Sequence, residues 1–284
     1  MSKPQPLITG LSFGESPRWH DGRLWVSDWG TREIIAVDPD GKSEVMVHLN
    51  FPSFQAICMD WLPDGRLLIV SSADGTLLCR QPDGTLATYA NLRGLSDKGW
   101  NEIVIDSRGN TYVNGGGFNL GSEPFVPGMI GLVTPDGSTR QVADGIAFPN
   151  GMAITADNST LIVAESYAKK LTAFDIVADG SLSNRRIWAD LGDGVPDGIC
   201  VDAGNAIWYA DVPNKCCKRV REGGEVLQTV ELDRGCFACA LGGTDRKTLF
   251  IVAREWRGLE NTANQELTGQ VLTVQAPAAG VGKP

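Results

Sequence analysis

Four polar side chains occupy the same point of an internal repeat, and their types are those that bind a hard cation. Each one opens a strand-like run that reaches an apolar residue four positions later, as Asn150 does with Ile154. Carboxylate and amide oxygens are the ligands that Ca²⁺, Mg²⁺ and Mn²⁺ prefer, whereas softer metals prefer sulfur or imidazole. The four residues are Glu15, Asn101, Asn150 and Asp197. The same register adds Gln55 and Phe237, so that six positions are equivalent.

The elements that would position these residues are short β-strands. A turn containing Asp, Gly or Asn precedes a short apolar run six times, at intervals of roughly 42 to 50 residues, which is the range of propeller blades. The six runs cover residues 21–26, 64–69, 108–113, 158–163, 204–209 and 246–251. Helical periodicity is almost absent. The repeat therefore predicts an all-β fold, a six-bladed β-propeller with four-stranded antiparallel blades.

The ends of the chain are expected to close the ring. Residues 270–274 and 7–9 are the strands expected to share the last blade, because a closed ring leaves no exposed sheet edge. Six repeats leave no room for another domain, so residues 1–284 are predicted to form a single domain. The Pro/Gly-rich segment 275–284 is expected to be a frayed tail.

In a propeller the innermost strands line the central channel, so the six equivalent residues would form a ring at one mouth. Two carboxylates, from Glu15 and Asp197, would then lie close together and raise one another's pKa unless a cation separates them. The alternative is that the polar residues only hydrate the mouth, since Asn and Asp favour turns anyway. Four positions in register favour the first interpretation, a site for one divalent cation.

Composition limits the remaining functions. A formal charge of −9 and a pI near 4.8 argue against a nucleic-acid partner. The apolar runs, such as residues 67–70, are too short to cross a membrane, and residues 1–6 contain no apolar signal region, so a cytoplasmic protein is expected. The seven cysteines are an odd number and scattered, which favours buried reduced thiols over a disulfide framework. The lone C-x-x-C at 236–239 lacks the second pair or the histidines of a zinc site. The oligomeric state is left open.

The chain resembles the senescence marker protein/gluconolactonase (regucalcin-like) family of six-bladed propellers. The stretches that carry the resemblance are GESPRWHDGRLWVSD at 14–28, FPNGMAIT at 148–155, VPDGICVDAGNAIWYAD at 195–211 and CFACALGGTDRKTLFIVAR at 236–254. The resemblance implies metal-dependent lactone hydrolysis, with the metal ligands falling on Glu15, Asn150 and Asp197. Asn101 matches a family residue that contacts substrate or metal.

Two departures from the family pattern bear on the substrate and the base. Animal members that act on sugar lactones carry Arg at the position of Gly99, so an anchor for sugar hydroxyls is missing. Some relatives carry a His near the metal that has been proposed as a base. This chain has no equivalent, because its only histidines, His20 and His48, fall outside the ring by register.

The expected mechanism uses the ring itself. The cation, with Ca²⁺ favoured and Mg²⁺, Mn²⁺, Zn²⁺ or Fe²⁺ as alternatives, would act as Lewis acid on the carbonyl of a small lactone or ester. Asp197 would be the general base, preferred to Glu15 because Gly198 leaves room for substrate and because the family points the same way. Asn101 would orient the carbonyl oxygen. Further substrate contacts are predicted for Trp100, Phe118, Phe148, Gln55 and Phe237.

Other interpretations remain open at this point. Asp197 could instead attack a phosphorus ester directly, as a nucleophile. The same site could belong to an arylesterase or organophosphate hydrolase, or to a metal-binding propeller without catalysis. Glu165 and Asp211, beside the strand ends of blades four and five, could be structural or could support the ring.

Overall fold

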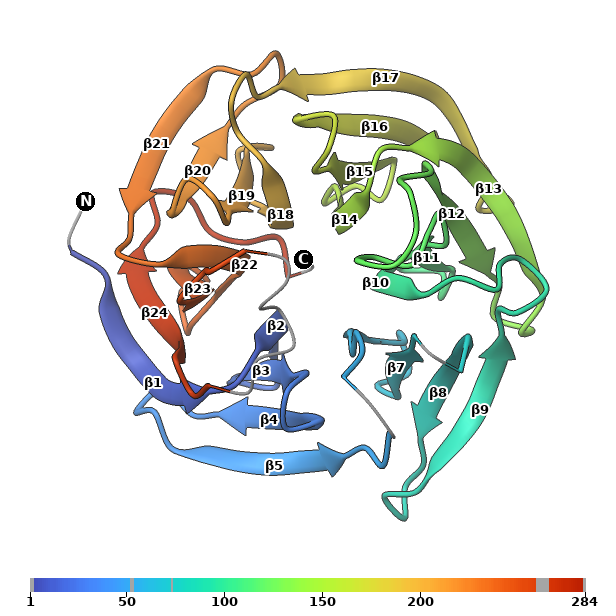
Figure 1. Ribbon diagram of the computed structural model, residues 1–284, viewed down its shortest axis with the longest axis horizontal. Coiled ribbons are helices and arrows are strands. Elements are labelled where there is room, and N and C mark those ends of the chain that lie inside the picture. The colour runs from blue at the N-terminus through green and yellow to red at the C-terminus, as the bar shows by residue number, and fades with distance from the viewer. Residues whose placement is uncertain (1–2, 52–53, 73, 259–265, 283–284) are drawn as a thin grey trace.

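The computed structural model describes residues 3–51, 54–72, 74–258 and 266–282. All strands in this part of the chain belong to six four-stranded antiparallel sheets. The sheets are arranged as blades around a central opening, and one edge strand of each blade lies innermost (Figure 1). The predicted all-β six-bladed propeller is confirmed.

The first three blades follow one another in chain order. Blade 1 contains β2 (Gly14–His20), β3 (Arg23–Asp28), β4 (Glu33–Val37) and β5 (Ser43–His48). Blade 2 contains β6 (Met59–Trp61), β7 (Leu67–Ser71), β8 (Thr76–Arg80) and β9 (Leu86–Asn91). Blade 3 contains β10 (Trp100–Ile105), β11 (Thr111–Gly115), β12 (Gly128–Val133) and β13 (Thr139–Ile146).

The last three blades include the closing one. Blade 4 contains β14 (Pro149–Ile154), β15 (Thr160–Glu165), β16 (Lys170–Ile176) and β17 (Leu182–Asp190). Blade 5 contains β18 (Pro196–Val201), β19 (Ile207–Asp211), β20 (Cys216–Val220) and β21 (Val226–Glu231). Blade 6 contains β22 (Gly235–Gly242), β23 (Thr248–Arg254), β24 (Gly269–Gln275) and, outermost, β1 (Gln5–Leu11).

The N-terminal strand closes the ring. In blade 6, β1 pairs antiparallel with β24, and Ile8 lies opposite Val271. The two ends of the chain thus share one sheet, which confirms the predicted closure and covers the edge that β24 would otherwise expose. In Figure 1 the first and last colours of the chain meet in this blade.

The segment after β24 differs from the expected frayed tail. Ala276 is buried, and its N–H donates to Lys247 O at 2.7 Å. Further along, Gly280 N donates to Arg246 O at 2.8 Å, and Ala203 N donates to Ala279 O at 2.7 Å. These backbone hydrogen bonds hold the tail against two turns of the propeller, so the expectation is wrong up to residue 282. Residues 283 and 284 lie outside the described residues.

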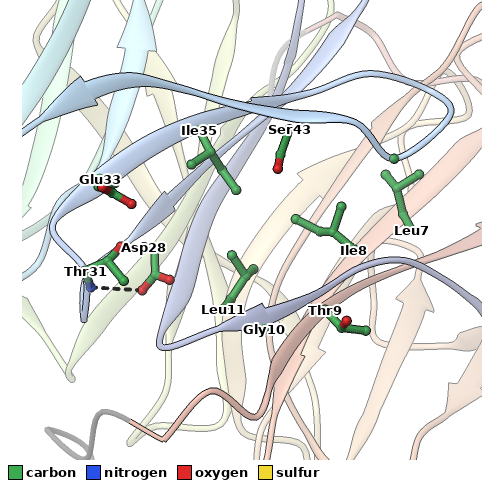
Figure 2. A pocket seen from close by; sticks show the side chains of 11 residues that line it. Leu7, Ile8, Thr9, Gly10, Leu11, Asp28, Thr31, Glu33, Ile35 and Ser43 are labelled. Atoms are coloured by element: carbon green, nitrogen blue, oxygen red, sulfur yellow. Dashed lines mark hydrogen bonds between the residues drawn. The ribbon is translucent and has the colours of Figure 1, made fainter.

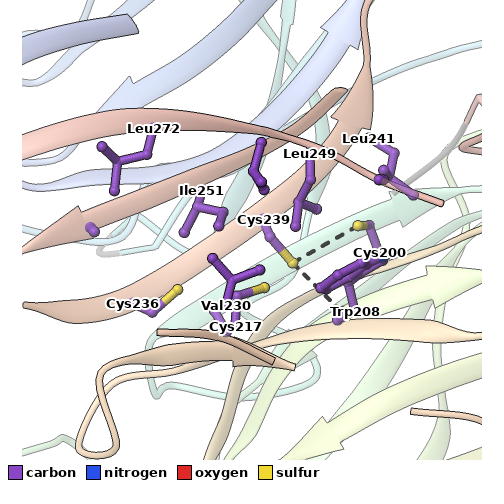
Figure 3. Close-up of a cluster of buried hydrophobic side chains, with 14 residues drawn as sticks. Cys200, Trp208, Cys217, Val230, Cys236, Cys239, Leu241, Leu249, Ile251 and Leu272 are labelled. Atoms are coloured by element: carbon purple, nitrogen blue, oxygen red, sulfur yellow. Dashed lines mark hydrogen bonds between the residues drawn. The ribbon is translucent and has the colours of Figure 1, made fainter. Parts of the chain in front are cut away.

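The core lies between blades rather than at the centre of the molecule. Apolar side chains from facing sheets form a separate cluster at each contact between neighbouring blades, as expected for sheets buried on both faces. All seven cysteines are free and buried, as predicted. Four of them belong to the cluster between blades 5 and 6, where Cys239 Sγ lies 3.8 Å from Cys200 Sγ (Figure 3). None of the described segments forms a helix that is long and apolar enough to cross a bilayer.

Candidate metal centre

Four of the six predicted ring residues come together at one end of the channel. Asn101 Nδ2 lies 3.4 Å from Asn150 Oδ1, and a hydrogen bond from the Asn150 amide reaches the Asp197 carboxylate. Asp197 in turn lies close enough to Glu15 to raise the pKa of its carboxyl. Each of the four is the second residue of its inner strand. The sequence register therefore identified a real spatial cluster.

The inner strands present these side chains by means of bulges. The pairing of β14 with β15 shifts between Pro149 and Met152, so that Asn150 and Gly151 together oppose one residue of β15. The same shift occurs at Asn101 in β10 and at Asp197 in β18, and directly after Glu15 in β2. A bulge turns a side chain away from the sheet face that it would otherwise occupy. The irregular pairing thus aims the polar residues at the channel.

The glycines that follow two of these residues allow the inner strands to approach one another. A Cβ on Gly151 would lie 2.5 Å from the backbone nitrogen of Ile199 in β18. A Cβ on Gly198 would lie 2.7 Å from Cβ of Ala238 in β22. Gly198 therefore makes room for the neighbouring strand, and the expectation that it leaves space for substrate is wrong. The preference for Asp197 over Glu15 as the general base therefore rests on the family resemblance.

Carboxylates at the ends of second strands fix the start of the ligand-bearing strands. Asp28, the last residue of β3, accepts hydrogen bonds from the N–H groups of Ser12 and Phe13, both at 2.8 Å. Glu165 of β15 accepts from Ala147 N at 2.8 Å, and Asp211 of β19 accepts from Val195 N at 3.2 Å. In each case the donor lies just before the inner strand that carries Glu15, Asn150 or Asp197.

This arrangement assigns a role to Glu165 and Asp211, which the sequence had left open. In blades 2, 3 and 6 the corresponding strands end instead in Ser71, Gly115 and Arg254. Among the described ends of these second strands, a buried carboxylate thus occurs only in the three blades that carry the predicted metal ligands. Asp28 belongs to this set and was not singled out from the sequence, although its place at the end of the run 23–28 could have identified it.

The electrostatics of the ring fit a divalent cation. Burial raises the pKa of the Glu15 carboxyl well above its ordinary value, and the neighbouring Asp197 and Glu102 carboxylates raise it further. Burial also raises the pKa of Asp197, against the hydrogen bond from Asn150. Within the described residues, neither carboxylate forms an ion pair with Lys or Arg. Two carboxylate and two amide side chains, of which Glu15 is buried and the other three are partly buried, form a donor set for a hard cation.

The described residues offer no alternative metal site made only of His, Cys and carboxylate side chains. Among the described residues, no group of three or more His, Cys, Asp and Glu side chains is placed to hold a metal ion. The ring does not contradict this finding, because half of its donors are amides. His20 stacks on Trp61 with ring centroids 4.1 Å apart, and His48 lies on the outer strand β5 beside Glu33. Neither histidine reaches the ring.

Below the ring, a buried ion pair connects blades 1 and 3, and a hydrogen bond beside it connects blades 1 and 2. Arg18 Nη2 of β2 lies 3.0 Å from Glu102 Oε1 of β10 and donates to Ile103 O at 3.0 Å. Ser16, which has a positive φ of 48°, accepts a hydrogen bond from Met59 N of β6 at 3.2 Å. This hydrogen bond adds a contact from blade 1 to β6, which has only three residues. No motif or spacing in the sequence indicates this pair.

The side chain of Asn114 also supports the site from behind. Its Oδ1 accepts a hydrogen bond from Glu102 N at 3.2 Å, and its Nδ2 donates to Asn150 O at 2.5 Å. Asn114 is fully buried at the end of β11. It thereby fixes β10 against β14, and with them Asn101 against Asn150.

The opposite mouth of the channel contains a second acidic group. A cavity of about 220 Å³ lies there, lined among others by Arg18, His20, Asp60 and Trp61. Asp60 is buried and accepts hydrogen bonds from Trp61 N at 2.9 Å and from Ile105 N at 2.8 Å. Burial nevertheless raises the pKa of its carboxyl to about 6, against the attraction of Arg18 and the two hydrogen bonds.

Asp60 should make the protein less stable as the pH rises. The folded carboxyl binds its proton more tightly than the unfolded one, whose ordinary pKa is 3.8. Its contribution to stability is therefore complete below pH ~4 and is lost as the pH rises through about 6, in all about 3 kcal/mol. The test is urea unfolding between pH 4.5 and 7.5, with saturating Ca²⁺ throughout. The unfolding free energy should fall less steeply with rising pH in Asp60→Asn than in the unmodified protein. Equal slopes would contradict this assignment.

The predicted substrate contacts separate into two groups. Trp100 is buried in the cluster between blades 2 and 3, so it packs in the core and does not face the mouth. Phe237 is also buried, with its ring 5.0 Å from Phe13 and 5.8 Å from Trp256. Phe118 and Phe148 are only half-buried, and their rings lie 5.8 Å apart. Gln55 lies before the short strand β6, in an irregular segment, and is buried.

A larger cavity lies between the closing strand and blade 1. It measures about 370 Å³ and is bounded by β1 and by strands of blade 1 (Figure 2). Its carboxylates are already engaged, since Asp28 accepts the backbone hydrogen bonds described above and Glu33 Oε1 lies 3.4 Å from His48 Nδ1. The remaining lining consists of aliphatic side chains, backbone and the hydroxyl groups of Thr9, Thr31 and Ser43. The lining contains no His or Cys, so the cavity lacks the donor set found at the ring.

Comparison with known proteins decides the family. The model of the SMP-30/gluconolactonase/LRE-like region matches residues 13–255, which include all six ring positions. The chain belongs to this family. The resemblance that the sequence motifs indicated is confirmed.

Members of the SMP-30/gluconolactonase/LRE-like family match along most of the chain. Regucalcin from Xenopus laevis is 25% identical over 291 residues, covering 95% of this chain and 95% of the relative. A pentonolactonase from Haloferax volcanii is 25% identical over 260 residues, covering 88% and 84%. The solved structure of a calcium-binding regucalcin from Agrobacterium tumefaciens has a TM-score of 0.82 at 20% identity and covers 100% of this chain and 96% of that one. This structural similarity shows that the two proteins share the propeller fold.

Proposed function

We propose that this protein is a divalent-metal-dependent hydrolase that opens a lactone ring. The observation that supports the proposal best is the cluster of Glu15, Asn101, Asn150 and Asp197 at one end of the channel, with two carboxyl pKa values raised by burial. Membership of a family whose named relatives include a pentonolactonase supports the substrate class.

The proposed cation ligands are Glu15, Asn150 and Asp197, and Ca²⁺ is the favoured ion because all donors are oxygens. When bound, such an ion supplies Lewis-acid polarisation of the substrate carbonyl. Asp197 accepts the proton of the attacking water as an oxygen–carbon bond forms at the acyl carbon. The acyl–oxygen bond of the ring then breaks and the proton passes to the leaving oxygen, which gives the hydroxy acid.

Asn101 is proposed to orient the carbonyl oxygen. Its Nδ2 donates to Pro149 O at 3.3 Å and to Asn150 Oδ1 at 3.4 Å, and both hydrogen bonds are long. The amide can therefore turn toward a substrate oxygen at small cost. A donor aimed at the developing oxyanion lowers the barrier because it is already in place.

Metal stripping tests the proposal. Proton release by the purified protein should be measured on γ- and δ-lactones, an aryl ester and a phosphotriester, before and after treatment with a chelator. We expect lactone turnover to fall at least ~10²-fold on stripping and to return with one of Ca²⁺, Mg²⁺, Mn²⁺, Zn²⁺ or Fe²⁺. The matched control is Glu15→Gln, which should need more of the same ion for half-maximal recovery.

Each other outcome points to a different function. Lactone turnover that is unaffected in protein shown by elemental analysis to be metal-free would contradict the metal-dependent mechanism. Turnover of the aryl ester or phosphotriester alone would favour an arylesterase or organophosphate hydrolase on the same site. Tight metal binding without turnover of any substrate would favour a binding role.

A further inference from the structure

Four aromatic side chains from blades 3 and 4 form one continuous cluster beside the ring. The Phe148 and Tyr167 rings are stacked 4.6 Å apart, and Phe125 lies 5.1 Å from Tyr167. Phe118 completes the cluster at 5.5 Å from Phe125 and 5.8 Å from Phe148. We call these residues, Phe118, Phe125, Phe148 and Tyr167, the aromatic shelf.

Two residues of the shelf are exposed, together with two neighbouring apolar side chains of the β11–β12 loop. Tyr167 is 47% and Phe125 is 44% exposed, and Leu120 and Val126 of the same β11–β12 loop are 44% and 51% exposed. These four make up almost half of the exposed large apolar side chains in the described part of the chain, and the others lie on several different blades. A contiguous exposed apolar surface, unlike scattered single residues, marks a binding site.

Two backbone connections tie the shelf to the proposed metal ligands. Phe148 directly precedes Pro149 and Asn150, and its φ of 60° is rare for a bulky residue. Tyr167 follows Ser166, whose Oγ accepts from Asn150 Nδ2 at 3.4 Å and donates to Pro196 O at 2.6 Å. The shelf therefore stands at a fixed position relative to the start of β14 and β18.

The β11–β12 loop that carries half of the shelf is held in place by polar contacts. Lys98 Nζ lies 2.8 Å from Glu123 Oε1, and Glu123 Oε2 accepts a hydrogen bond from Asn119 N at 2.9 Å. Gly117 packs so closely on the backbone of Val126 and Gly128 that no side chain would fit there. These contacts hold the loop, with its exposed apolar side chains Leu120, Phe125 and Val126, in a preformed arrangement.

We propose that the aromatic shelf binds an alkyl or aryl arm on the lactone substrate. The proposal rests on the proposed function, because the ring of the lactone must reach Asn101 and Asp197 while its arm lies on the shelf. Polyhydroxylated arms would leave their hydroxyl groups against carbon, whereas an apolar arm removes its own surface and that of the shelf from water. The substrate class is therefore a lipophilic lactone rather than a sugar-acid lactone.

A series of γ-lactones with alkyl arms of one to eight carbons tests the shelf. We expect kcat/KM to rise by up to about fourfold for each added CH₂, as for apolar surface that leaves water. The ratio of kcat/KM between the longest and the shortest lactone should fall by about tenfold in Phe125→Ala and in Tyr167→Ala. Ile187→Ala, an exposed apolar residue of β17 in a different place, is the matched control and should keep the ratio.

A binding measurement separates failure of the shelf from failure of the proposed function. A γ-lactam with an octyl arm cannot be opened like the ester, and calorimetry should show that it binds at least ~10-fold more tightly than the methyl lactam. Lactone turnover with no dependence on arm length, and equal lactam affinities, would overturn the shelf and leave the hydrolase proposal intact. Tight octyl-lactam binding that Tyr167→Ala weakens, without lactone turnover, would support the shelf as an apolar site and overturn the hydrolase. A change from dimer to monomer in Tyr167→Ala, with no effect of arm length, would show that a second copy covers the shelf and would overturn it as a substrate site.

Discussion

Replacing Asp197 with Asn should lower kcat for lactone hydrolysis at least ~10²-fold while the propeller remains folded. Asn has nearly the same shape and keeps an oxygen for a cation, but it cannot accept the proton of the attacking water. The metal-free variant should be at least as stable as the unmodified protein near pH 7, because it lacks one of two buried carboxylates that repel one another. Steady-state kinetics at saturating metal and urea unfolding of the stripped protein measure the two effects.

Comparison of Asp197→Asn with Glu15→Gln distinguishes a general base from a residue that only binds the metal. Both substitutions remove one negative charge from the ring, so both should weaken cation affinity, which calorimetry can measure. Only Asp197→Asn should keep its loss of kcat when the ion concentration is raised to saturation. Equal recovery of the two variants at saturation would show that Asp197 is a ligand only, and that the base lies elsewhere.

The fold could be predicted from the sequence because its signals are local and repeated. Each blade requires a turn residue such as Gly22 or Asn205 with positive φ, followed by a short apolar strand, and six copies reinforce one another. The structure of the segment after β24 could not be predicted in this way. Its Pro and Gly composition indicated fraying, but Ala276 and Gly280 are held by hydrogen bonds to turns that are distant in sequence.

The candidate site was predicted in part for a similar reason. Equivalent positions of a closed ring must meet, so register alone brought Glu15, Asn101, Asn150 and Asp197 together. The register could not reveal which way a residue faces when a neighbouring strand is close, and so Trp100 packs in the core and Gly198 accommodates Ala238. Contacts between different blades carry no sequence periodicity.

The buried pair of Arg18 and Glu102 is such a contact, and breaking it should have the largest effect on stability. Arg18→Met leaves the Glu102 carboxylate buried near Glu15 without its guanidinium, at an expected cost of about 3–5 kcal/mol in unfolding free energy. Adding Glu102→Gln to this variant should recover part of the loss, because the uncompensated charge is then gone. Urea unfolding of the four metal-free proteins gives the coupling energy between the two side chains.

The two single substitutions, Arg18→Met and Glu102→Gln, should change cation affinity in opposite directions. Arg18 places a positive charge beside the ring, so Arg18→Met should bind Ca²⁺ more tightly, whereas Glu102→Gln should bind it more weakly, since Glu102 adds negative potential at both Glu15 and Asp197. Calorimetric titration of the stripped proteins measures this directly. A coupling energy near zero would show that Asp60, the other carboxylate near Arg18, balances its charge instead. Unchanged affinities in both variants would show that the charges below the ring do not act on the cation, and that the pair serves only to join blades 1 and 3.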